Sequence, residues 1–299
     1  MVSPVTLPPT ALPADLDGEV RLNEPMADHT TFRIGGPADG WVRPRTVAAL
    51  ARLLAAWEGP VTVVGRGSNL LVRDGGIRGV VIDLHHLDHC QRDGDTVVVG
   101  GGLALGRLVR RLGEMGLGGL EALAGIPGTV GAAVRMNGGA HGCEIGDLLM
   151  EARIASRDGR LAWRPAATLG LAYRTSGLAD DEWVVEARFA ARPAPAGARE
   201  RIRALLAQRR AAQPVTLPSA GSIFKNPGGA PAWRLIRDAG LAGRQIGGAQ
   251  ISPQHTNFIV NHGGATAADV EALIHLAHDA VLDDSGIDLE LEVVVLGEL

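Results

Sequence analysis

The sequence has 299 residues, of which 46% are apolar and 21% charged, and its net charge is −4 at neutral pH. This composition predicts a soluble globular protein whose length allows two or three domains. The negative charge and the lack of Lys/Arg runs argue against a nucleic-acid surface, and no apolar run is long enough to span a bilayer. Cys90 and Cys143 are too few for a disulfide framework, so we expect two reduced thiols.

The first part of the chain reads as a proline-rich arm followed by alternating strands and a helix. The prolines of the arm predict an extended conformation. The arm lacks a basic segment followed by an apolar core, so we expect no secretory signal and a cytoplasmic location. The spacing of apolar residues predicts the elements that follow. They are a short strand closed by a turn over 30–37, a helix over 44–57, and strands over 61–64 and 79–84. The arm prolines are Pro4, Pro8, Pro9 and Pro13.

A first glycine-rich loop, Gly65–Val72, follows the strand over 61–64. It begins like a dinucleotide fingerprint but lacks the third glycine, and an apolar run follows Asn69, so a Rossmann crossover fits poorly. We interpret it as a loop between β elements whose backbone and Ser68 and Asn69 side chains hydrogen-bond a phosphate group.

The segment His85–Cys90 contains three histidines and invites a metal interpretation. His85 and His89 would share a helix face, but a second ligand pair at zinc-like spacing is missing. Because the segment lies between predicted strands, this one-face geometry fails, and we expect no metal site.

The second part of the chain continues the alternation of helices and strands, which predicts the α+β or α/β class. Asp158-Gly159 is a hairpin signal, and prolines at 214 and 218 mark the entrance to another domain. Thr266 and Asp269 resemble a helix-capping pair. The predicted helices are 103–115, 198–211, 232–239 and 266–283. The predicted strands are 96–99, 150–156, 160–164, 182–190, 248–252, 258–261 and 287–296.

A second glycine-rich stretch, Gly125–Gly142, surrounds the short helix-permitting run Ala132–Met136. A helix start without side chains presents bare N–H groups and the positive end of a dipole, which suit a phosphate. We therefore expect an anionic cofactor here. The alternative is a glycine-rich loop at a tight domain junction.

Three polar clusters are candidate sites. The only lysine, Lys225, lies with Ser222 and Asn226 in one tight segment, and the only tyrosine precedes Arg174. Glu290 and Glu292 lie two apart on the predicted last strand, so they face the same side. Such a pair is usually solvated, but beside a cleft a carboxylate facing an Arg could orient an anionic substrate or relay a proton.

At these residues the sequence closely resembles the UDP-N-acetylenolpyruvoylglucosamine reductase family, flavin enzymes of peptidoglycan precursor synthesis. Each motif is modestly specific, but the ordered set covers most of the chain and is highly specific. The matching segments are 31–36, 65–71, 119–142, 173–176, 221–227, 255–261 and 289–297.

The resemblance implies an α+β, three-domain flavoenzyme. Two modules of the vanillyl-alcohol-oxidase type hold FAD, and a C-terminal α/β domain binds the substrate. Carried onto this chain, the FAD-binding subdomains are 1–84 and 85–213 and the substrate domain is 214–299, with the last strand, 287–299, a candidate to pack with the first subdomain.

The resemblance also implies the reaction. NADPH reduces non-covalent FAD, a hydride passes to C3 of the enolpyruvyl ether of UDP-N-acetylglucosamine, and a serine protonates C2 to give UDP-N-acetylmuramate. The serine matches Ser222, the catalytic arginine Arg174 and the acidic partner Glu292. The substrate is a small molecule, and we expect no membrane, nucleic-acid or obligate protein partner.

Further residues are implied as contacts. The expected substrate contacts are Tyr173, Lys225, Asn226, His255 and Asn257. The expected FAD contacts are Gly65, Arg66, Gly67, Ser68, Asn69, Leu70, Gly125, Ile126, Pro127, Gly128, Thr129, Gly131, Ala132, Asn137, Gly138 and Ala140. The chain departs from the family pattern at Ala132, where a glycine is usual, and at His141, where a tyrosine is usual. It has no tyrosine beyond 173, so it resembles the shorter subclass that lacks a Tyr-bearing loop.

Two other functions compete with this one. A sugar or lactone oxidase could use the same scaffold, but many of those tether FAD through a His or Cys that Gly65–Leu70 lacks. A flavin- or nucleotide-binding module without catalysis is the other. Consumption of NADPH and the effect of removing the Ser222 hydroxyl separate the three.

Overall fold

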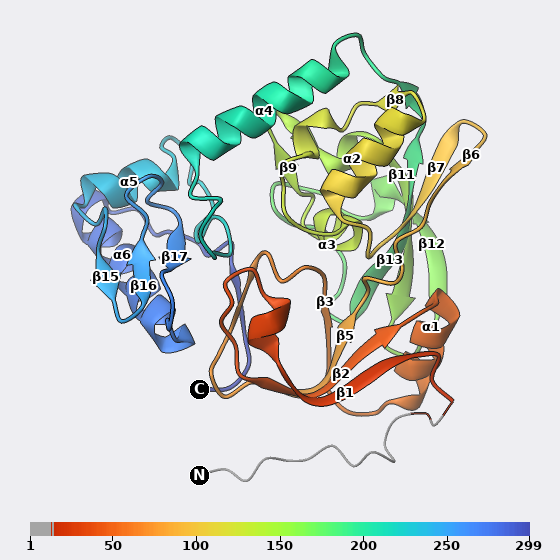
Figure 1. Ribbon diagram of the computed structural model, residues 1–299, viewed down its shortest axis with the longest axis horizontal. Helices are drawn as coiled ribbons and strands as arrows, with labels where there is room; N and C mark the ends of the chain where they lie inside the picture. The colour runs from red at the N-terminus through yellow and green to blue at the C-terminus, as the bar shows by residue number, and fades with distance from the viewer. Residues whose placement is uncertain (1–12, 14) are drawn as a thin grey trace. The chain divides into compact units, whose positions relative to one another are not determined.

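The structure, a computed structural model, describes Pro13 and residues 15–299 (Figure 1). Most of the predicted proline-rich arm, with Pro4, Pro8 and Pro9, lies outside the described residues. The chain divides into two compact units. Unit 1 holds the described residues up to Leu22, Asp39–Arg66 and Gly79–Ala207, and unit 2 holds Asn23–Ala38, Gly67–Arg78 and Gln208–Leu299. The predicted three-domain division stays a prediction.

A four-stranded sheet has the order β1-β2-β5-β3. Its strands are β1 (Gly18–Pro25), β2 (Pro37–Pro44), β3 (Val61–Val64) and β5 (Ile77–Asp83). In unit 1, helix α1 (Val47–Ala56) buries Leu50 and Leu53 against Val80 and Ile82. The helix begins later than predicted because the Thr46 hydroxyl accepts a hydrogen bond from the Ala49 N–H and caps it.

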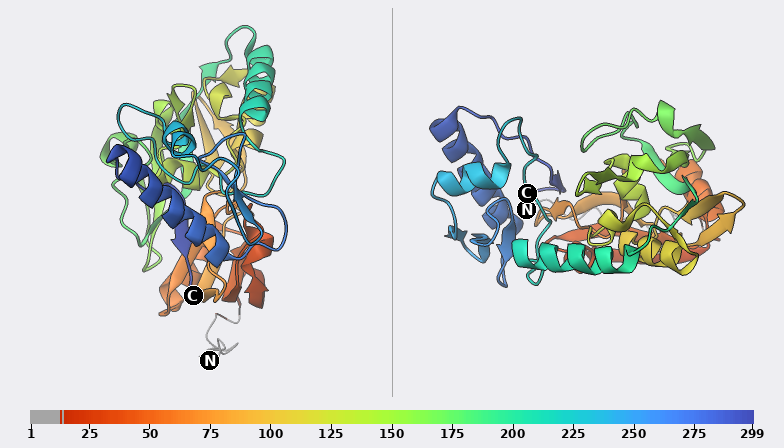
Figure 2. Two further views of the ribbon diagram at one scale, coloured as in Figure 1. Left: turned by 90° about the vertical axis from the view of Figure 1, so that its left-hand side faces the viewer. Right: turned by 90° about the horizontal axis from the view of Figure 1, so that it is seen from above.

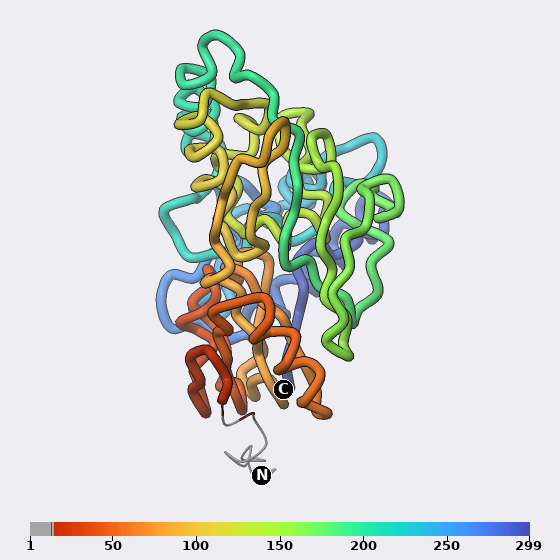
Figure 3. Tube along the Cα trace, turned by 90° about the vertical axis from the view of Figure 1, so that its right-hand side faces the viewer, coloured from red at the N-terminus to blue at the C-terminus, as the bar shows by residue number. Residues whose placement is uncertain are grey.

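Unit 1 also contains a five-stranded antiparallel sheet of order β12-β11-β13-β7-β6, which Figure 3 shows from another side. Helices α2 and α3 cover one face, where their apolar residues form a core with alternate strand residues (Figure 1). The strands are β6 (Cys90–Asp93), β7 (Thr96–Gly100), β11 (Leu149–Ser156), β12 (Leu161–Pro165) and β13 (Glu182–Ala190), and the helices are α2 (Leu105–Glu114) and α3 (Val130–Arg135).

Unit 2 has a three-stranded sheet of order β15-β16-β17 and two helices, the longer of which is the dark-blue α6 in Figure 2. Thr266 and Asp269 form the predicted capping box, and the helix ends at Gly286, whose φ is +69°. The sequence also predicts an apolar face for this helix, and its residues Val270, Leu273, Ile274, Ala277 and Val281 are buried. The elements are α5 (Ala232–Asp238), α6 (Ala267–Ser285), β15 (Gln245–Ile246), β16 (Ala249–Ile251) and β17 (Ile259–Asn261).

The remaining elements are short, apart from helix α4 (Ala198–Ala212). The short strands are β4 (Leu70–Val72), β8 (Leu117–Gly118), β9 (Gly139–Ala140), β10 (Cys143–Glu144), β14 (Arg192–Pro193) and β18 (Val294–Leu296). The 3₁₀ turns are Met26–His29, Glu121–Leu123, Ile145–Asp147 and Ala166–Thr168. Among the helices of residues 15–299, none has the combination of length and apolar composition needed to cross a bilayer.

Two predicted strands differ from the structure. Residues 30–37 form a turn before β2, because the Thr30 hydroxyl bonds the Ile34 carbonyl at 2.8 Å and Arg33 has φ +55°. The predicted last strand, 287–296, is shortened to β18, which pairs in parallel with β4. Upstream of β18 only Leu291 forms a bridge, with Phe224, so this segment changes partner along its length.

Candidate active site

The segment Gly221–Lys225 in unit 2 is held between two other parts of the chain. Ser222 forms an antiparallel bridge with Phe258, and Phe224 forms one with Leu291. The Lys225 N–H donates to the Glu290 carbonyl at 2.8 Å, and Gly221 has φ +79°, which favours glycine where the segment begins. Pairing on both sides fixes the backbone that carries the Ser222 hydroxyl.

Asn257 fastens the same segment with its side chain. Its Oδ1 accepts from the Phe224 N–H at 2.9 Å, and its Nδ2 donates to the Phe224 carbonyl at 2.8 Å. Its backbone carbonyl accepts from the Ile223 N–H at 2.9 Å. Asn257 is 3% exposed, so we assign it to positioning the Ser222 segment, and substrate contact through its amide stays a prediction.

Glu292 lies beside the Ser222 segment. Its N–H donates to the Ile223 carbonyl at 2.8 Å, and its own carbonyl accepts from Asn69 Nδ2 at 2.8 Å. Three predicted site residues, Ser222, Glu292 and Asn69, are therefore joined in unit 2 although they are far apart in the sequence.

The lone lysine has a carboxylate partner. Lys225 Nζ forms an ion pair with Glu290, whose side chain is 73% exposed. Asn226 Oδ1 accepts from the Ala232 N–H at 3.0 Å and so bonds the first turn of α5. Both were predicted substrate contacts. An incoming phosphate would compete with Glu290 for the Lys225 ammonium.

The two glycine-rich stretches meet in unit 1. A Cβ on Gly65 would lie 2.6 Å from Thr129 Oγ1, so only glycine allows this approach. Thr129 is 2% exposed and is the N-cap residue of α3, yet its hydroxyl forms no hydrogen bond with a described residue. Bare backbone beside an uncommitted hydroxyl fits the close approach of a dinucleotide such as FAD.

The start of α3 is not as bare as the sequence predicted. The Val130 N–H donates to the Leu103 carbonyl at 2.9 Å, and the Gly131 N–H donates to the Gly101 carbonyl at 2.8 Å. A Cβ on Gly131 would lie 2.6 Å from the Val184 carbonyl oxygen. This glycine is therefore required by packing of α3 on β13, and the expectation of free N–H groups is wrong at these two positions.

Arg174 contacts the second glycine-rich stretch. Its Nη2 donates to the Gly139 carbonyl at 3.0 Å, and its guanidinium lies 5.0 Å from the centre of the Tyr173 ring, which is 48% exposed. Arg174 has φ +56°, an unfavourable backbone conformation for a non-glycine residue. The turn thus holds Arg174 against the predicted flavin-binding residues of unit 1.

Asn137, a predicted FAD contact, is committed internally. Its Nδ2 donates to Glu144 Oε2 at 2.5 Å and to the Ala172 carbonyl at 3.3 Å. Its Oδ1 accepts from the Gly146 N–H at 3.3 Å. The side chain therefore connects the loops around Gly139 and Arg174.

The chemistry of Cys143 agrees with non-covalent FAD. Burial, together with Asp147 and Glu121, raises the pKa of the Cys143 thiol to about 11. A thiol that stays protonated is a poor nucleophile.

The predicted site residues divide between the two units. Arg174 and Tyr173 belong to unit 1 with the FAD contacts Gly65, Arg66 and those between Gly125 and Ala140. Ser222, Glu292 and the other predicted substrate contacts belong to unit 2 with the FAD contacts Gly67–Leu70. The geometry of Arg174 relative to Ser222 stays a prediction.

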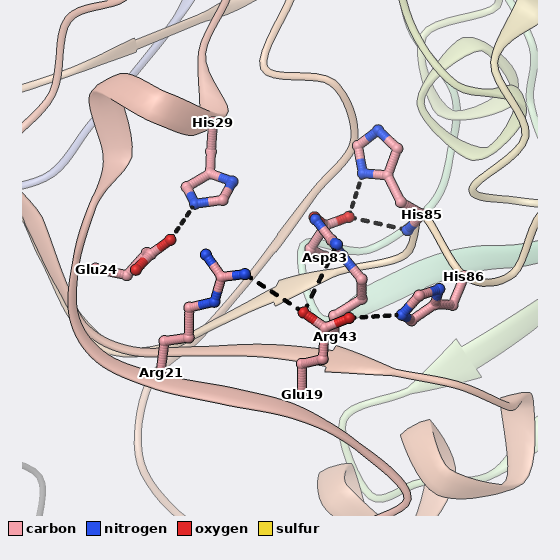
Figure 4. Close-up of polar contacts among 8 residues, drawn as sticks. All are labelled: Glu19, Arg21, Glu24, His29, Arg43, Asp83, His85 and His86. Carbon is pink, nitrogen blue, oxygen red and sulfur yellow. Dashed lines mark hydrogen bonds and ion pairs between the residues drawn. The ribbon is translucent and has the colours of Figure 1, made fainter.

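The three histidines of residues 85–89 each contact a different carboxylate, and the carboxylate that His85 contacts also binds an arginine. In unit 1, His85 Nδ1 bonds Asp83, His86 Nε2 bonds Glu19 Oε1 at 3.0 Å, and Arg43 bonds Asp83 Oδ2 at 2.8 Å (Figure 4). His89 Nε2 lies 3.1 Å from Glu186 Oε1. Within the described part of the chain, no three His, Cys, Asp or Glu side chains gather as metal ligands.

Sequence reasoning missed one group in unit 2, which contains Arg209, Trp233 and His255. Of these only His255 was predicted to act. Arg209 is one of 28 arginines, as 29 basic residues include a single lysine, so composition could not mark it.

Comparisons with known proteins identify the family. Residues 213–296 match the family described as UDP-N-acetylenolpyruvoylglucosamine reductase, C-terminal domain, and residues 38–163 match the FAD binding domain. The UDP-N-acetylenolpyruvoylglucosamine reductase of Geobacter metallireducens is 48% identical over 96% of this chain and 97% of its own. That of Halalkalibacterium halodurans is 45% identical over 94% and 95%.

A solved structure agrees with these sequence matches. The crystal structure of UDP-N-acetylenolpyruvylglucosamine reductase from Thermus caldophilus superposes with a TM-score of 0.80 at 37% identity, covering 93% of this chain and 98% of that one. The predicted α+β class and the FAD cofactor are confirmed. The chain belongs to the UDP-N-acetylenolpyruvoylglucosamine reductase family.

Proposed function

We propose that this chain uses NADPH and FAD to reduce the enolpyruvyl ether of UDP-N-acetylglucosamine to UDP-N-acetylmuramate, a peptidoglycan precursor. Family membership over nearly the full length of the chain and its relatives supports the reaction. The observation that carries the site assignment is the pairing of the Ser222 segment with residues 290–292.

The two glycine-rich stretches would hold FAD, which would supply the hydride chemistry that links NADPH to C3 of the substrate. Negative charge then builds at C2 and spreads into the attached carboxylate. The Arg174 guanidinium stabilises this enolate. Glu292 acts as a protonated carboxyl that donates a hydrogen bond, since an ionised carboxylate would repel the enolate.

Ser222 completes the reaction by donating its hydroxyl proton to C2. A serine hydroxyl is a weak acid, so its orientation must be fixed while the charge develops. The two-sided backbone pairing and the Asn257 side chain supply this rigidity.

We further infer a cytoplasmic enzyme that acts on a small-molecule UDP-sugar without an obligate protein partner. Cys90 and Cys143 are both free thiols, in keeping with a reducing compartment.

The test separates the two half-reactions. Purified protein should show a flavin absorption band that bleaches with NADPH and returns when the enolpyruvyl substrate is added. In Ser222→Ala we expect bleaching at the original rate and turnover lowered by about 10²- to 10⁴-fold. The control is Ser285→Ala, which removes a hydroxyl bonded to the Val281 carbonyl in α6. Equal turnover in both variants would refute the role of Ser222, and reoxidation by oxygen alone would favour an oxidase.

A further inference from the structure

Arg174 lies at the tip of a tight turn in unit 1. The backbones of Ala172 and Thr175 exchange two hydrogen bonds, of 3.1 and 3.2 Å, which leaves only Tyr173 and Arg174 between them. The φ of Arg174 is +56°, in the left-handed region that favours glycine. A turn that keeps an arginine in this conformation depends on support from the surrounding structure.

A buried amide supplies part of that support. Asn137 is 3% exposed, and its Nδ2 donates at 3.3 Å to the carbonyl of Ala172, the same carbonyl that closes the Arg174 turn. Its Oδ1 accepts from the Gly146 N–H at 3.3 Å. A Cβ on Gly146 would lie 2.8 Å from this oxygen, so glycine keeps the room that the amide needs. The Asn137 side chain therefore ties the Arg174 turn to the loop that follows β10.

Glu144, which was not among the predicted site residues, holds this amide in turn. Its Oε2 accepts from Asn137 Nδ2 at 2.5 Å. Glu144 is also the N-cap residue of the 3₁₀ turn Ile145–Asp147, where it forms a reciprocal capping box with Asp147. The capping bonds restrict the Glu144 side chain, so its carboxylate is a fixed acceptor for the Asn137 amide.

The same two residues also determine the surroundings of the Arg174 guanidinium. Arg174 Nη2 donates to the Gly139 carbonyl at 3.0 Å, and Gly139 lies only two residues after Asn137. In the antiparallel pair of β9 and β10, Gly139 is directly opposite Glu144. Glu144 thus holds the strand that accepts the guanidinium, and Asn137 holds the turn that carries the Arg174 backbone. Both ends of Arg174 depend on this pair.

Ending a helix does not by itself account for Asn137. The residue follows α3 and has φ +42°, and the Gly138 N–H donates to the Ala133 carbonyl at 2.7 Å, as at a helix C-terminus. Glycine would adopt this backbone conformation with less strain. What asparagine adds at this position is its set of side-chain bonds to Glu144, Ala172 and Gly146.

We propose that Glu144 and Asn137 are positioning residues that direct the Arg174 guanidinium toward the substrate enolate. The inference rests on the proposed function, in which Arg174 stabilises that enolate. A guanidinium stabilises a carboxylate or enolate oxygen well only when its planar donors point at the oxygen, so a misdirected arginine loses most of its effect. Reduction of FAD by NADPH forms no enolate. Only the second half-reaction should therefore depend on the pair.

The test follows the two half-reactions separately by rapid mixing of FAD-loaded protein. Asn137→Gly keeps the backbone conformation and removes the amide. It should bleach with NADPH at the wild-type rate, whereas reoxidation by the enolpyruvyl substrate should slow by about 10- to 100-fold. Glu144→Ala should behave in the same way, and Glu144→Gln, which retains an oxygen acceptor for Asn137 Nδ2, should recover most of the rate. The control is Glu114→Ala, which removes an exposed carboxylate of α2 that lies 3.7 Å from Arg110.

A double-mutant cycle with Arg174→Ala separates positioning from a general structural role. If Asn137 acts through Arg174, adding Asn137→Gly to Arg174→Ala should slow reoxidation no further. Multiplication of the two losses would overturn the proposal. Equal slowing of bleaching and reoxidation in Asn137→Gly would indicate a role in holding FAD and would also overturn it.

A crystal structure of Asn137→Gly distinguishes failure of this inference from failure of the proposed function. We expect Arg174 Nη2 to leave the Gly139 carbonyl in the variant, and an unchanged Arg174 would overturn the positioning role. If the wild type does not reduce the enolpyruvyl substrate, the proposed function fails, but the displacement of Arg174 in the variant still tests whether Asn137 positions it.

Discussion

Two clusters of basic side chains, one in each unit, are built in opposite ways. In unit 1, Arg43, His85 and His86 surround Asp83 and Glu19, and each of the three basic groups contacts a carboxylate (Figure 4). In unit 2, Arg209 and His255 lie together without any described carboxylate contact. The first cluster satisfies its charges internally, whereas the second leaves the buried His255 Nδ1 without a described partner.

The difference affects the pKa of the buried group in each cluster. Asp83 is 2% exposed, and burial alone would raise the pKa of its carboxyl. Hydrogen bonds from His85 and Arg43 outweigh burial, so the net shift of the Asp83 pKa is downward. For His255 no carboxylate partner is found among the described residues, and burial lowers its pKa. A histidine in a sequence carries no sign of which case applies.

The largest effect is expected from breaking the paired cluster. Asp83→Ala leaves Arg43 and His85 without their shared partner and should lower the free energy of unfolding by about 3–5 kcal/mol. Urea unfolding of FAD-loaded protein measures this change. The control is Asp158→Ala, whose ion pair with Arg160 is exposed and should contribute little. Equal stability of the two variants would show that the cluster in unit 1 is not structural.

A smaller loss of stability is expected from removing the Asn257 side chain in unit 2, whose amide hydrogen bonds are all made within the protein. Asn257→Ala removes both bonds to Phe224 and leaves buried backbone groups unpaired, which costs about 1–3 kcal/mol of unfolding free energy. Because the same bonds fix the Ser222 backbone, turnover should also fall while bleaching of FAD by NADPH is kept. Loss of stability without any loss of turnover would contradict the positioning role of Asn257.

The sequence predicted local features well and nonlocal ones poorly. The capping box of Thr266 and Asp269 and the buried stripe of α6 depend on residues within a few turns, and both are confirmed. The last strand was predicted too long because Leu291 pairs with Phe224 while Val294 pairs with β4, and periodicity does not reveal a change of partner. β1 was missed, although alternation of Val20 and Leu22 with charged residues was the signal for it.

The candidate site shows the same limit. Ser222 and Glu292 were chosen by resemblance, and their adjacency became visible only through the backbone bonds between their segments. Free N–H groups were expected at Gly131 from its glycine pattern, but a glycine also permits close packing, as it does against Val184. Arg209 had no local signal at all, because lacking a partner is a property of the folded surroundings.

The smallest effect is expected from pH, and the pH range in which stability is lost distinguishes the two clusters. The folded-state pKa of His255 lies below its unfolded value of about 6.5. As pH falls through the unfolded value, the unfolded chain binds a proton that the folded chain does not, so stability falls until the folded pKa is reached. Asp83 also has a lowered pKa, but its contribution is kept above the unfolded value of about 3.9 and is lost only as pH falls through its folded pKa.

Urea unfolding at pH 7.5 and 5.5 should therefore show a loss of stability from His255 while Asp83 remains fully paired. His255→Gln cannot titrate and should lose less stability than the wild type between these two pH values. The same pH slope in wild type and His255→Gln would place the titrating group elsewhere and erase the contrast between the two clusters.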